Sequence, residues 1–379
     1  MYNGVFRAFI TKALKIKTET CMRVIVDAFG GDNAPSEMVK GALSALLRDS
    51  ELNVLFVGKE KETLDAIKEA VGDSEIKCID GLVTFGGAKS AASGRMTVAN
   101  ADEVIGCDES PTQAVRTKKN SSIVVGLNML KNDPENVAFV SAGSTGAILT
   151  GAYLIVKRIK GISRPAMAPL LPTLKGGQVI LCDCGANADC KAEHLVHFAV
   201  MADKYMTVMN GIKNPRIGLL SNGSEEEKGN ELTKEAHALL KNTEGINFVG
   251  NIEARDIISG DVDIVVCDGF SGNIALKASE GMANGIMKLL KDGIMNGGLK
   301  GKLGALFIKD VLRNIKHTMD YNENGGAMFI GVEKVVVKAH GSSKASAIAN
   351  AVIQAKELAK KDVIGKIKES LGGVTFNEA

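Results

Sequence analysis

The sequence predicts an α/β protein whose mainly parallel sheet is covered by helices on both faces. Short apolar segments rich in β-branched residues alternate with amphipathic helical segments along most of the 379 residues. Several apolar segments end in turns rich in glycine, serine and asparagine, and each of these turns leads into a helix. Because 45% of the residues are hydrophobic, the chain can bury a large core, in two domains or in one unit with two lobes.

The composition argues against several classes of protein. The 46 basic and 44 acidic residues nearly cancel, so bulk charge gives no reason to expect a nucleic-acid partner. The 7 cysteines are scattered through a long chain, which favours free thiols in a reducing compartment such as the cytoplasm. No apolar run is long enough to span a bilayer.

Residues 1–21 differ from the rest of the chain. Phe6, Phe9 and Leu14 share a helical face with basic residues around them, which is compatible with a helix on a membrane surface. A signal peptide does not fit, because charge interrupts the apolar segment and no small-residue cleavage site follows. We expect a disordered extension, or a chain that properly begins at Met22.

The first strands and helices follow the alternation. A strand over 23–28 leads through a tight turn to a helix that starts near Pro35, and a strand over 53–57 precedes a helix over 60–71. Residues 81–95 are rich in Gly, Ala and Ser and predict a loop.

A basic cluster follows that loop. Arg116, Lys118 and Lys119 form either a solvated helix face or a wall that attracts an acidic partner.

Five later strands end in turns that suit ligand binding. These strands are predicted at 137–140, 179–181, 217–220, 264–266 and 335–338. Since the carboxyl ends of parallel strands lie on one side of a sheet, we expect the five turns to lie on one rim. Free backbone N–H groups at helix starts bind anions, which favours a phosphate-bearing ligand. The candidate binding residues in these turns are Gly143, Ser144, Thr145, Gly146, Asn187, Asn222, Gly272, Asn273 and His340.

Other chemistries lack their signatures. Cys182 and Cys184 are one residue apart at a strand end, so they point to opposite faces and predict no metal site. No glycine pattern of the dinucleotide-binding or Walker type is present, and neither Ser144 nor Ser271 lies in a nucleophile elbow. We therefore expect no cofactor.

Seven motifs carry a family resemblance. The runs VDAFGGDNAP, VSAGSTGA, DCGANAD, EEEKGNELT, NIEARDI, VDIVVCDGFSGNIALK and KAHGSS occur in this order from Met22 nearly to the end. Together they resemble the phosphate acyltransferases that work with acyl carrier protein, the PlsX family. Ser144 stands where that family usually has asparagine, and Phe29 stands where it usually has methionine.

The resemblance implies a reaction, a fold and partners. The reaction transfers a fatty acyl group from acyl-[acyl carrier protein] to inorganic phosphate and gives acyl phosphate for phospholipid (phosphatidic acid) synthesis, with a glycerol-3-phosphate acyltransferase downstream. The implied fold is a three-layer α/β/α sandwich similar to isopropylmalate dehydrogenase and phosphotransacetylase, over residues 22–379, as a homodimer.

The chemistry of this reaction explains why no catalytic triad is visible. Phosphate is already an anionic nucleophile, and a thiolate with a pKa of about 8.5 is a fair leaving group. What remains is positioning the reactants and stabilising an oxyanion.

Two residues are the leading catalytic candidates. We expect Lys228 to be a catalytic or phosphate-binding cation, and Asn273 to donate to phosphate or thioester, to cap its helix, or to do both. His340 either protonates the leaving group or braces its loop. Asp183 and Asp268 are expected to accept hydrogen bonds from backbone N–H groups.

Residues 281–321 predict a protruding helical hairpin, with its join near Gly297 and Gly298. Its apolar stripes suit packing against a second copy of the chain. Its tip mixes residues such as Leu303 and Phe307 with lysines, which suits peripheral contact with the inner face of the cell membrane.

Other functions stay open at this point. The chain fits an acyl-CoA phosphotransacylase on the same fold, or a non-enzymatic membrane-attached scaffold for lipid synthesis. A decarboxylating dehydrogenase would need clustered metal-binding aspartates and a nicotinamide site, and the sequence shows neither.

Overall fold

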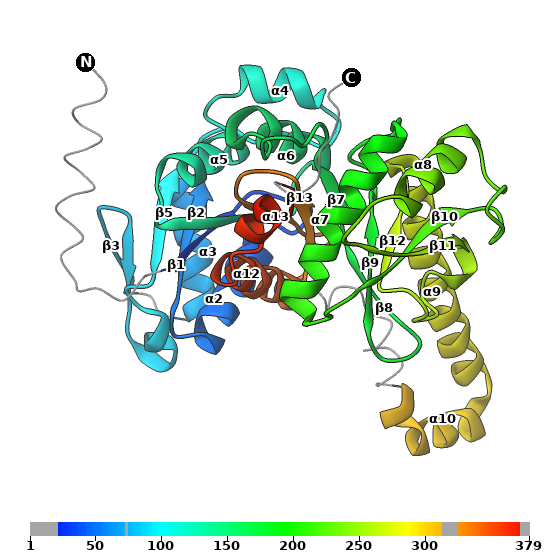
Figure 1. The fold of residues 1–379 in the computed structure, drawn as a ribbon. Helices are drawn as coiled ribbons and strands as arrows, with labels where there is room; N and C mark the ends of the chain where they lie inside the picture. The colour runs from blue at the N-terminus through cyan, green and yellow to red at the C-terminus, as the bar shows by residue number, and fades with distance from the viewer. Residues whose placement is uncertain (1–21, 73–74, 313–324, 372–379) are drawn as a thin grey trace.

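The computed structural model describes residues 22–72, 75–312 and 325–371. The predicted extension over 1–21 lies outside these residues, as does the end of the predicted hairpin. Within the described chain, the strands form two sheets of nine and five strands, each mainly parallel and covered by helices (Figure 1). The predicted α/β fold with helices on both faces is therefore confirmed.

The larger sheet contains the chain's first strands at its centre. Its strands, in the order β3-β4-β5-β2-β1-β6-β14-β13-β7, are β3 (Lys77–Ile79), β4 (Leu82–Thr84), β5 (Met96–Asn100), β2 (Leu52–Gly58), β1 (Met22–Asp27), β6 (Asn136–Ser141), β14 (Val335–Lys338), β13 (Ala327–Ile330) and β7 (Ala166–Ala168). The strands β5, β2, β1, β6 and β14 run parallel, so their carboxyl ends share one edge.

Helices cover both faces of this sheet because its strands are buried on both sides. Val24 and Val26 of β1 pack into one core and Ile25 into another, as the alternation of side chains along a strand requires. One face carries α2 (Ser36–Arg48), α3 (Glu60–Val71) and α12 (Ala345–Lys360), while α13 (Val363–Leu371) follows α12. The other face carries α4 (Pro111–Thr117), α5 (Ser122–Asn132), α6 (Thr145–Gly151) and the π-helical turn η2 (Ala152–Val156).

The smaller sheet holds the other three predicted turns. Its strands, in the order β11-β10-β12-β9-β8, are β11 (Asn247–Glu253), β10 (Arg216–Ser221), β12 (Ile264–Val266), β9 (Gln178–Cys182) and β8 (Leu170–Pro172). One face packs against α7 (Ala192–Asn210) and α8 (Glu231–Lys241), and the other packs against the start of α9 (Gly269–Asn296) and Ile257, which follows the short helix η3 (Ala254–Asp256). The expectation of a single rim is wrong, because β6 and β14 lie in one sheet and β9, β10 and β12 in the other.

The two sheets share one continuous core. A single cluster of buried side chains includes Val24 and Val352 from the first lobe and Phe198 and Val266 from the second. Helix α7 joins the lobes, since it packs against both α13 and β9. The carboxyl edges of the two sheets are thereby held in a fixed relation.

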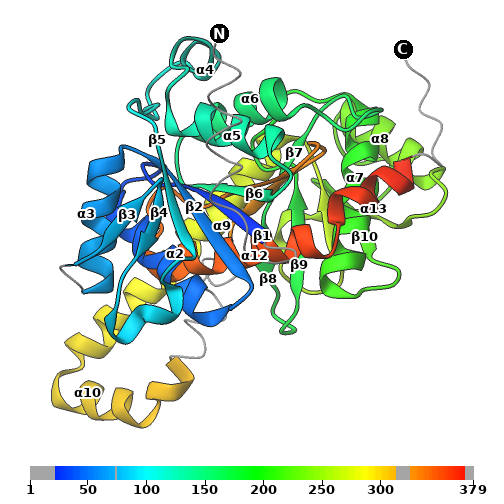
Figure 2. The same cartoon turned by 90° about the vertical axis from the view of Figure 1, so that its left-hand side faces the viewer.

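The helix α9 extends away from the body as an arm that ends in α10 (Gly298–Phe307), as Figure 2 also shows. The predicted join is confirmed, since α9 ends at Asn296 and α10 begins at Gly298. The predicted start at 281 is wrong, because α9 begins at Gly269.

The arm carries many exposed apolar side chains, among them Met282, Leu289, Leu306 and Phe307. No helix in the described part of the chain is long and apolar enough to cross a membrane.

One segment predicted as a loop contains regular secondary structure. Residues 81–95, predicted as a loop, contain the short strand β4 and the 3-10 helix η1 (Gly87–Ala92).

Candidate active site

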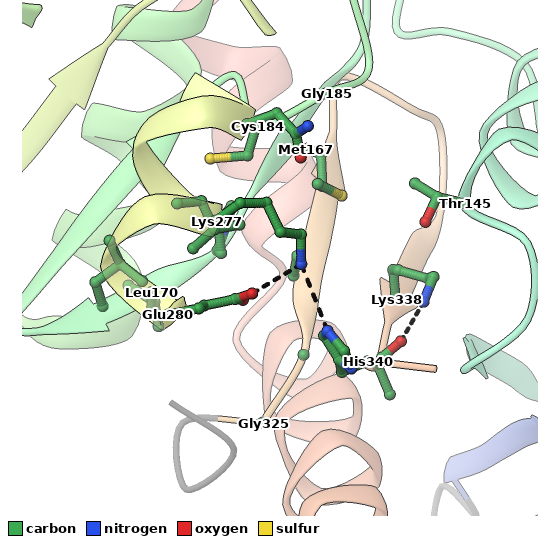
Figure 3. Close-up of a pocket in the computed structure, with 17 residues that line it drawn as sticks. Thr145, Met167, Leu170, Cys184, Gly185, Lys277, Glu280, Gly325, Lys338 and His340 are labelled. Carbon is green, nitrogen blue, oxygen red and sulfur yellow. Dashed lines mark hydrogen bonds and ion pairs between the residues drawn. The ribbon is translucent and has the colours of Figure 1, made fainter. Parts of the chain in front are cut away.

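A cavity of about 280 Å³ lies where the carboxyl edges of the two sheets meet (Figure 3). The larger sheet contributes the residues that follow β6 and β14, and the smaller sheet contributes those that follow β9 and β12. The lining residues are Thr145, Met167, Pro169, Leu170, Leu171, Cys184, Gly185, Asn273, Leu276, Lys277, Glu280, Gly325, Gly326, Ala327, Lys338, Ala339 and His340.

One end of the cavity is cationic. Lys277 Nζ donates to Glu280 Oε2 at 2.8 Å and lies 3.5 Å from His340 Nε2. His340 Nδ1 lies 2.8 Å from Ser342 Oγ. Lys277 Nζ can only donate to Nε2, and the backbone N–H of Ser342 can only donate to Nδ1, at 3.3 Å, so these contacts select no single tautomer of His340.

Lys338 lies at the same end. It is the last residue of β14, and its Nζ donates to the carbonyl oxygen of Ala339. Burial lowers the pKa of Lys338 to about 8, and the positive charge of Lys277 adds to this.

Burial also lowers the pKa of His340, and Lys277 acts in the same direction, so both favour the neutral imidazole. A neutral imidazole does not suit the predicted role of His340 as a proton donor to the leaving group.

The opposite wall of the cavity is apolar. Met167 follows the first residue of β7, Leu170 and Leu171 begin β8, and Leu276 lies two turns into α9. The last three are buried, with at most 9% of their surface exposed. The cavity therefore combines a cationic end and an apolar wall, a pairing that suits an anion beside an acyl chain.

Three of the predicted site residues line this cavity: Thr145, Asn273 and His340. Asn273 lies beside Gly185, and its side-chain amide donates to no residue in the described chain. Its helix begins earlier than predicted, at Gly269, because Asp268 caps it by accepting from Ser271 N at 2.9 Å. The expectation that Asn273 caps the helix is wrong, and its side chain is left to face the cavity.

The residues on either side of Thr145 shape the turn after β6 and so position its side chain. Ser144 caps α6, since its Oγ accepts from Ala147 N at 3.4 Å. Gly143 N donates to Ser141 Oγ at 3.0 Å, and a Cβ on Gly146 would lie 2.5 Å from Pro111. In this structure Ser144, Gly143 and Gly146 shape the turn and do not line the cavity.

Asn187 and Gly272 lie behind the cavity wall. Asn187 Nδ2 donates to Pro165 O at 2.7 Å and to Asp183 Oδ2 at 2.9 Å, so its amide holds its own turn. A Cβ on Gly272 would lie 1.9 Å from Asp183 O, so only glycine lets α9 approach β9 this closely.

Asp183 and Asp268 bind backbone N–H groups, as predicted. Asp183 accepts from the N–H groups of Met167, Ala186 and Asn187, and Asp268 accepts from that of Ser271. Burial raises the pKa of Asp183, and these hydrogen bonds act against that rise.

Lys228 and Asn222 lie on the turn after β10, outside the residues that line the cavity. Both side chains are exposed, and Lys228 forms no ion pair with any described residue. The turn is adjacent to the one that leads into α9, because β10 pairs in parallel with β12.

Lys277, Glu280 and Lys338 are not among the site residues predicted from the sequence. A signal for the first two was present, since residues 273, 277 and 280 follow the spacing of one helix face. Lys338 directly precedes the AHGSS turn, at the end of an otherwise apolar strand.

No group of three or more His, Cys, Asp or Glu side chains suited to a metal ion occurs among the described residues. Cys182 and Cys184 lie in separate cores, as their spacing predicted. Burial raises the pKa of both thiols well above the ordinary range, so neither is a ready thiolate nucleophile.

Comparison with known proteins places the chain in a family. The profile of the family described as "Fatty acid synthesis protein" matches residues 22–366. The phosphate acyltransferase of Caldanaerobacter subterraneus subsp. tengcongensis is 47% identical over 350 residues, covering 92% of this chain and 97% of that protein. A putative phosphate acyltransferase of Clostridium perfringens is 45% identical over 356 residues, covering 94% and 98%.

A solved structure supports the fold. A phosphotransacetylase from Streptococcus pyogenes superposes with a TM-score of 0.58 at 18% identity, covering 95% of this chain and 99% of that one. From the sequence matches, the chain belongs to the fatty acid synthesis protein family, which is the family of the phosphate acyltransferases, and it is a transferase.

Proposed function

We propose that this transferase moves a fatty acyl group from acyl-[acyl carrier protein] to inorganic phosphate and releases acyl phosphate. The relatives named phosphate acyltransferase support phosphate as the acceptor. The observation that carries the proposal is the cavity, which joins a cationic end to an apolar wall. A phosphate ion is anionic and suits the cationic end, and an acyl thioester is largely apolar and suits the apolar wall. Both reactants therefore fit side by side in the cavity.

Phosphate binds at the cationic end. Lys277 and Lys338 both face the cavity, and Glu280 is the sole carboxylate among the described residues that line it. Two ammonium groups against one carboxylate attract a dianion and hold it through charge-assisted hydrogen bonds. The Thr145 hydroxyl adds a donor from the turn over 143–146.

Lys228 supports phosphate binding from the neighbouring turn. It stands after β10, which is the strand beside β12, and its long flexible stem gives its ammonium group a wide reach. Asn222 belongs to the same turn and serves to shape it.

The acyl carbonyl lies beside Asn273. When a phosphate oxygen attacks the carbonyl carbon, charge develops on the carbonyl oxygen, and the free Asn273 amide donates a hydrogen bond to it. No strong general base is required, because phosphate is already an anion. The acyl chain lies along Leu170, Leu171 and Leu276.

The carrier protein docks beside the cavity. The exposed residues Lys157, Arg158, Lys160 and Arg164 form a basic loop between η2 and β7. Met167, three residues beyond Arg164, lines the cavity. An acidic carrier protein held by this loop would have the cavity within reach of its acyl group.

The arm adds two contacts in this proposal. The base of α9 packs against a second copy of the chain, and α10 touches the inner face of the cell membrane. The exposed fractions of Leu303, Leu306 and Phe307 are 50%, 66% and 87%, which suits burial in a lipid interface. The enzyme is then cytoplasmic and peripherally membrane-bound, and it releases acyl phosphate where a glycerol-3-phosphate acyltransferase uses it.

One assay tests the reaction. The full chain is incubated with phosphate and either palmitoyl carrier protein or palmitoyl-CoA, and acyl phosphate is trapped with hydroxylamine. Product from the carrier protein supports the proposal, whereas product from CoA alone would assign the chain as an acyl-CoA phosphotransacylase. No product from either donor would favour a non-enzymatic scaffold.

A second assay tests the arm. Charged residues at Leu303 and Phe307 should abolish binding to anionic liposomes while the thermal unfolding midpoint stays unchanged. Binding equal to that of the native chain would remove the membrane contact from the proposal.

A further inference from the structure

Lys338 is the ammonium group in the cavity that has no carboxylate partner. Its Nζ donates to the carbonyl oxygen of Ala339, and the described residues offer it no ion pair. Lys277, in contrast, is held by Glu280 at 2.8 Å. The proton of Lys338 is therefore held less firmly than that of a lysine in an ion pair.

Titratable side chains from several elements act electrostatically on Lys338. Asp27 comes from β1, Asp32 from the turn after β1, Cys107 from the segment before α4 and Lys277 from α9. Burial and Lys277 favour the neutral amine, whereas the other three favour the ammonium ion. Burial is the largest effect, and the pKa of Lys338 falls to about 8.

The proposed reaction contains a step that such a group suits. When the tetrahedral intermediate collapses, the carbon–sulfur bond breaks and a thiolate leaves. The thiol of the carrier protein's prosthetic group is an alkyl thiol, whose pKa is about 8.5. Proton transfer is most effective when donor and acceptor have similar pKa values near the working pH.

We propose that Lys338 is a catalytic residue that carries a proton from phosphate to the departing thiol. This inference rests on the proposed function of the cavity. An oxygen of HPO₄²⁻ attacks the thioester carbon, the carbon–sulfur bond breaks, and the Lys338 ammonium group protonates the sulfur. The neutral amine then takes the proton from the hydroxyl of the acyl phosphate, which the acyl group has made more acidic. The products are dianionic acyl phosphate, the free thiol and the ammonium form of Lys338, so charge and protons balance.

His340 and Lys277, which also line the cavity, suit this role less well. Nδ1 of His340 accepts from the backbone N–H of Ser342, and burial lowers the pKa of the ring, so the imidazolium form that would donate a proton is disfavoured. Lys277 forms an ion pair with Glu280 at 2.8 Å and suits phosphate binding.

The test compares two leaving groups. Acyl transfer to phosphate is measured with an alkyl thioester of pantetheine and with an aryl thioester, whose more acidic thiol leaves without a proton. Lys338→Met should lower kcat about 10²–10³-fold with the alkyl donor and less than about tenfold with the aryl donor. Equal losses with the two donors, in a variant that unfolds at the native temperature, would overturn the proposal.

A second variant separates charge from proton transfer. Lys338→Arg keeps a positive charge, but guanidinium does not give up a proton near neutral pH. This variant should bind phosphate with an almost unchanged KM and remain slow with the alkyl donor. Full activity with the alkyl donor would show that charge alone is needed, and it would contradict proton transfer by Lys338.

The unmodified protein provides a check that needs no substitution. At saturating phosphate, its kcat with the alkyl donor should fall above about pH 8, as Lys338 loses its proton, while its kcat with the aryl donor does not. Parallel pH profiles would overturn the inference even though acyl phosphate forms. Absence of acyl phosphate from both donors would instead count against the proposed function.

Discussion

Lys277 and Lys228 follow neighbouring strands of the smaller sheet, yet they lie in different surroundings. Lys277 projects from α9 into a cavity, donates to Glu280 and lies 3.5 Å from His340. Lys228 stands on an exposed turn, outside the lining of that cavity and without an ion pair to any described residue. The same residue type therefore lies among the side chains of a cavity at one position and on an exposed turn at the other.

The difference shows what creates the cationic end. Lys277 has its neighbours because the turn after β14, in the other sheet, brings His340 against α9. The turn after β10 is farther along the sheet order from β9, the strand whose end lines the cavity. The site forms because the carboxyl edges of the two sheets face each other. A glycine-rich turn alone does not create it.

The largest effect should come from removing Lys277. Lys277→Met removes a charge that faces phosphate in the cavity, so kcat/KM for phosphate should fall about 10²–10³-fold. The rate is measured by hydroxylamine trapping with phosphate varied. Lys288→Met, on an exposed position of the same helix, is the matched control and should leave the rate unchanged.

A loss of less than about threefold for Lys277→Met would contradict the assignment of phosphate to this end of the cavity. The proposed difference in phosphate binding between Lys277 and Lys228 would then have no support.

The next largest effect should be on stability, from substitutions that disturb the close approach of α9 to β9. This approach holds the cavity wall in place. A Cβ on Gly272 would meet Asp183 O, whereas one on Gly281 of the same helix has open space around it. Gly272→Ala should destabilise the protein by about 1–3 kcal/mol, and Gly281→Ala should stabilise it by about 0.5–1 kcal/mol. Urea unfolding of the two variants measures the difference, and equal midpoints would argue that the backbone moves freely here.

Local patterns predicted much of the fold. The helix over 60–71 and the strand over 335–338 have the predicted bounds, because apolar periodicity and flanking turns define both. The strand β11 was missed because it is an edge strand whose run alternates with polar residues and glycine. The division into two sheets was also missed, since pairing between distant strands, such as β14 with β6, leaves no local signal.

The candidate site was predicted only where turns define it. Thr145, Asn273 and His340 follow strand ends, and the structure brings them to one cavity. Lys277 and Lys338 were missed because a lysine in a helix or at a strand end is most often solvated. Only the approach of the second sheet changes their surroundings, and that approach depends on packing through α7.

The smallest effect should come from Lys228. Because its side chain is exposed, its charge is screened by water, and Lys228→Met should raise KM for phosphate by about tenfold or less while kcat stays nearly constant. Lys234→Met, an exposed lysine on α8, is the control for the general loss of positive charge near this turn. A loss as large as that of Lys277→Met would mean that the turn after β10 closes over bound phosphate, and the phosphate site would then extend beyond the cavity toward β10.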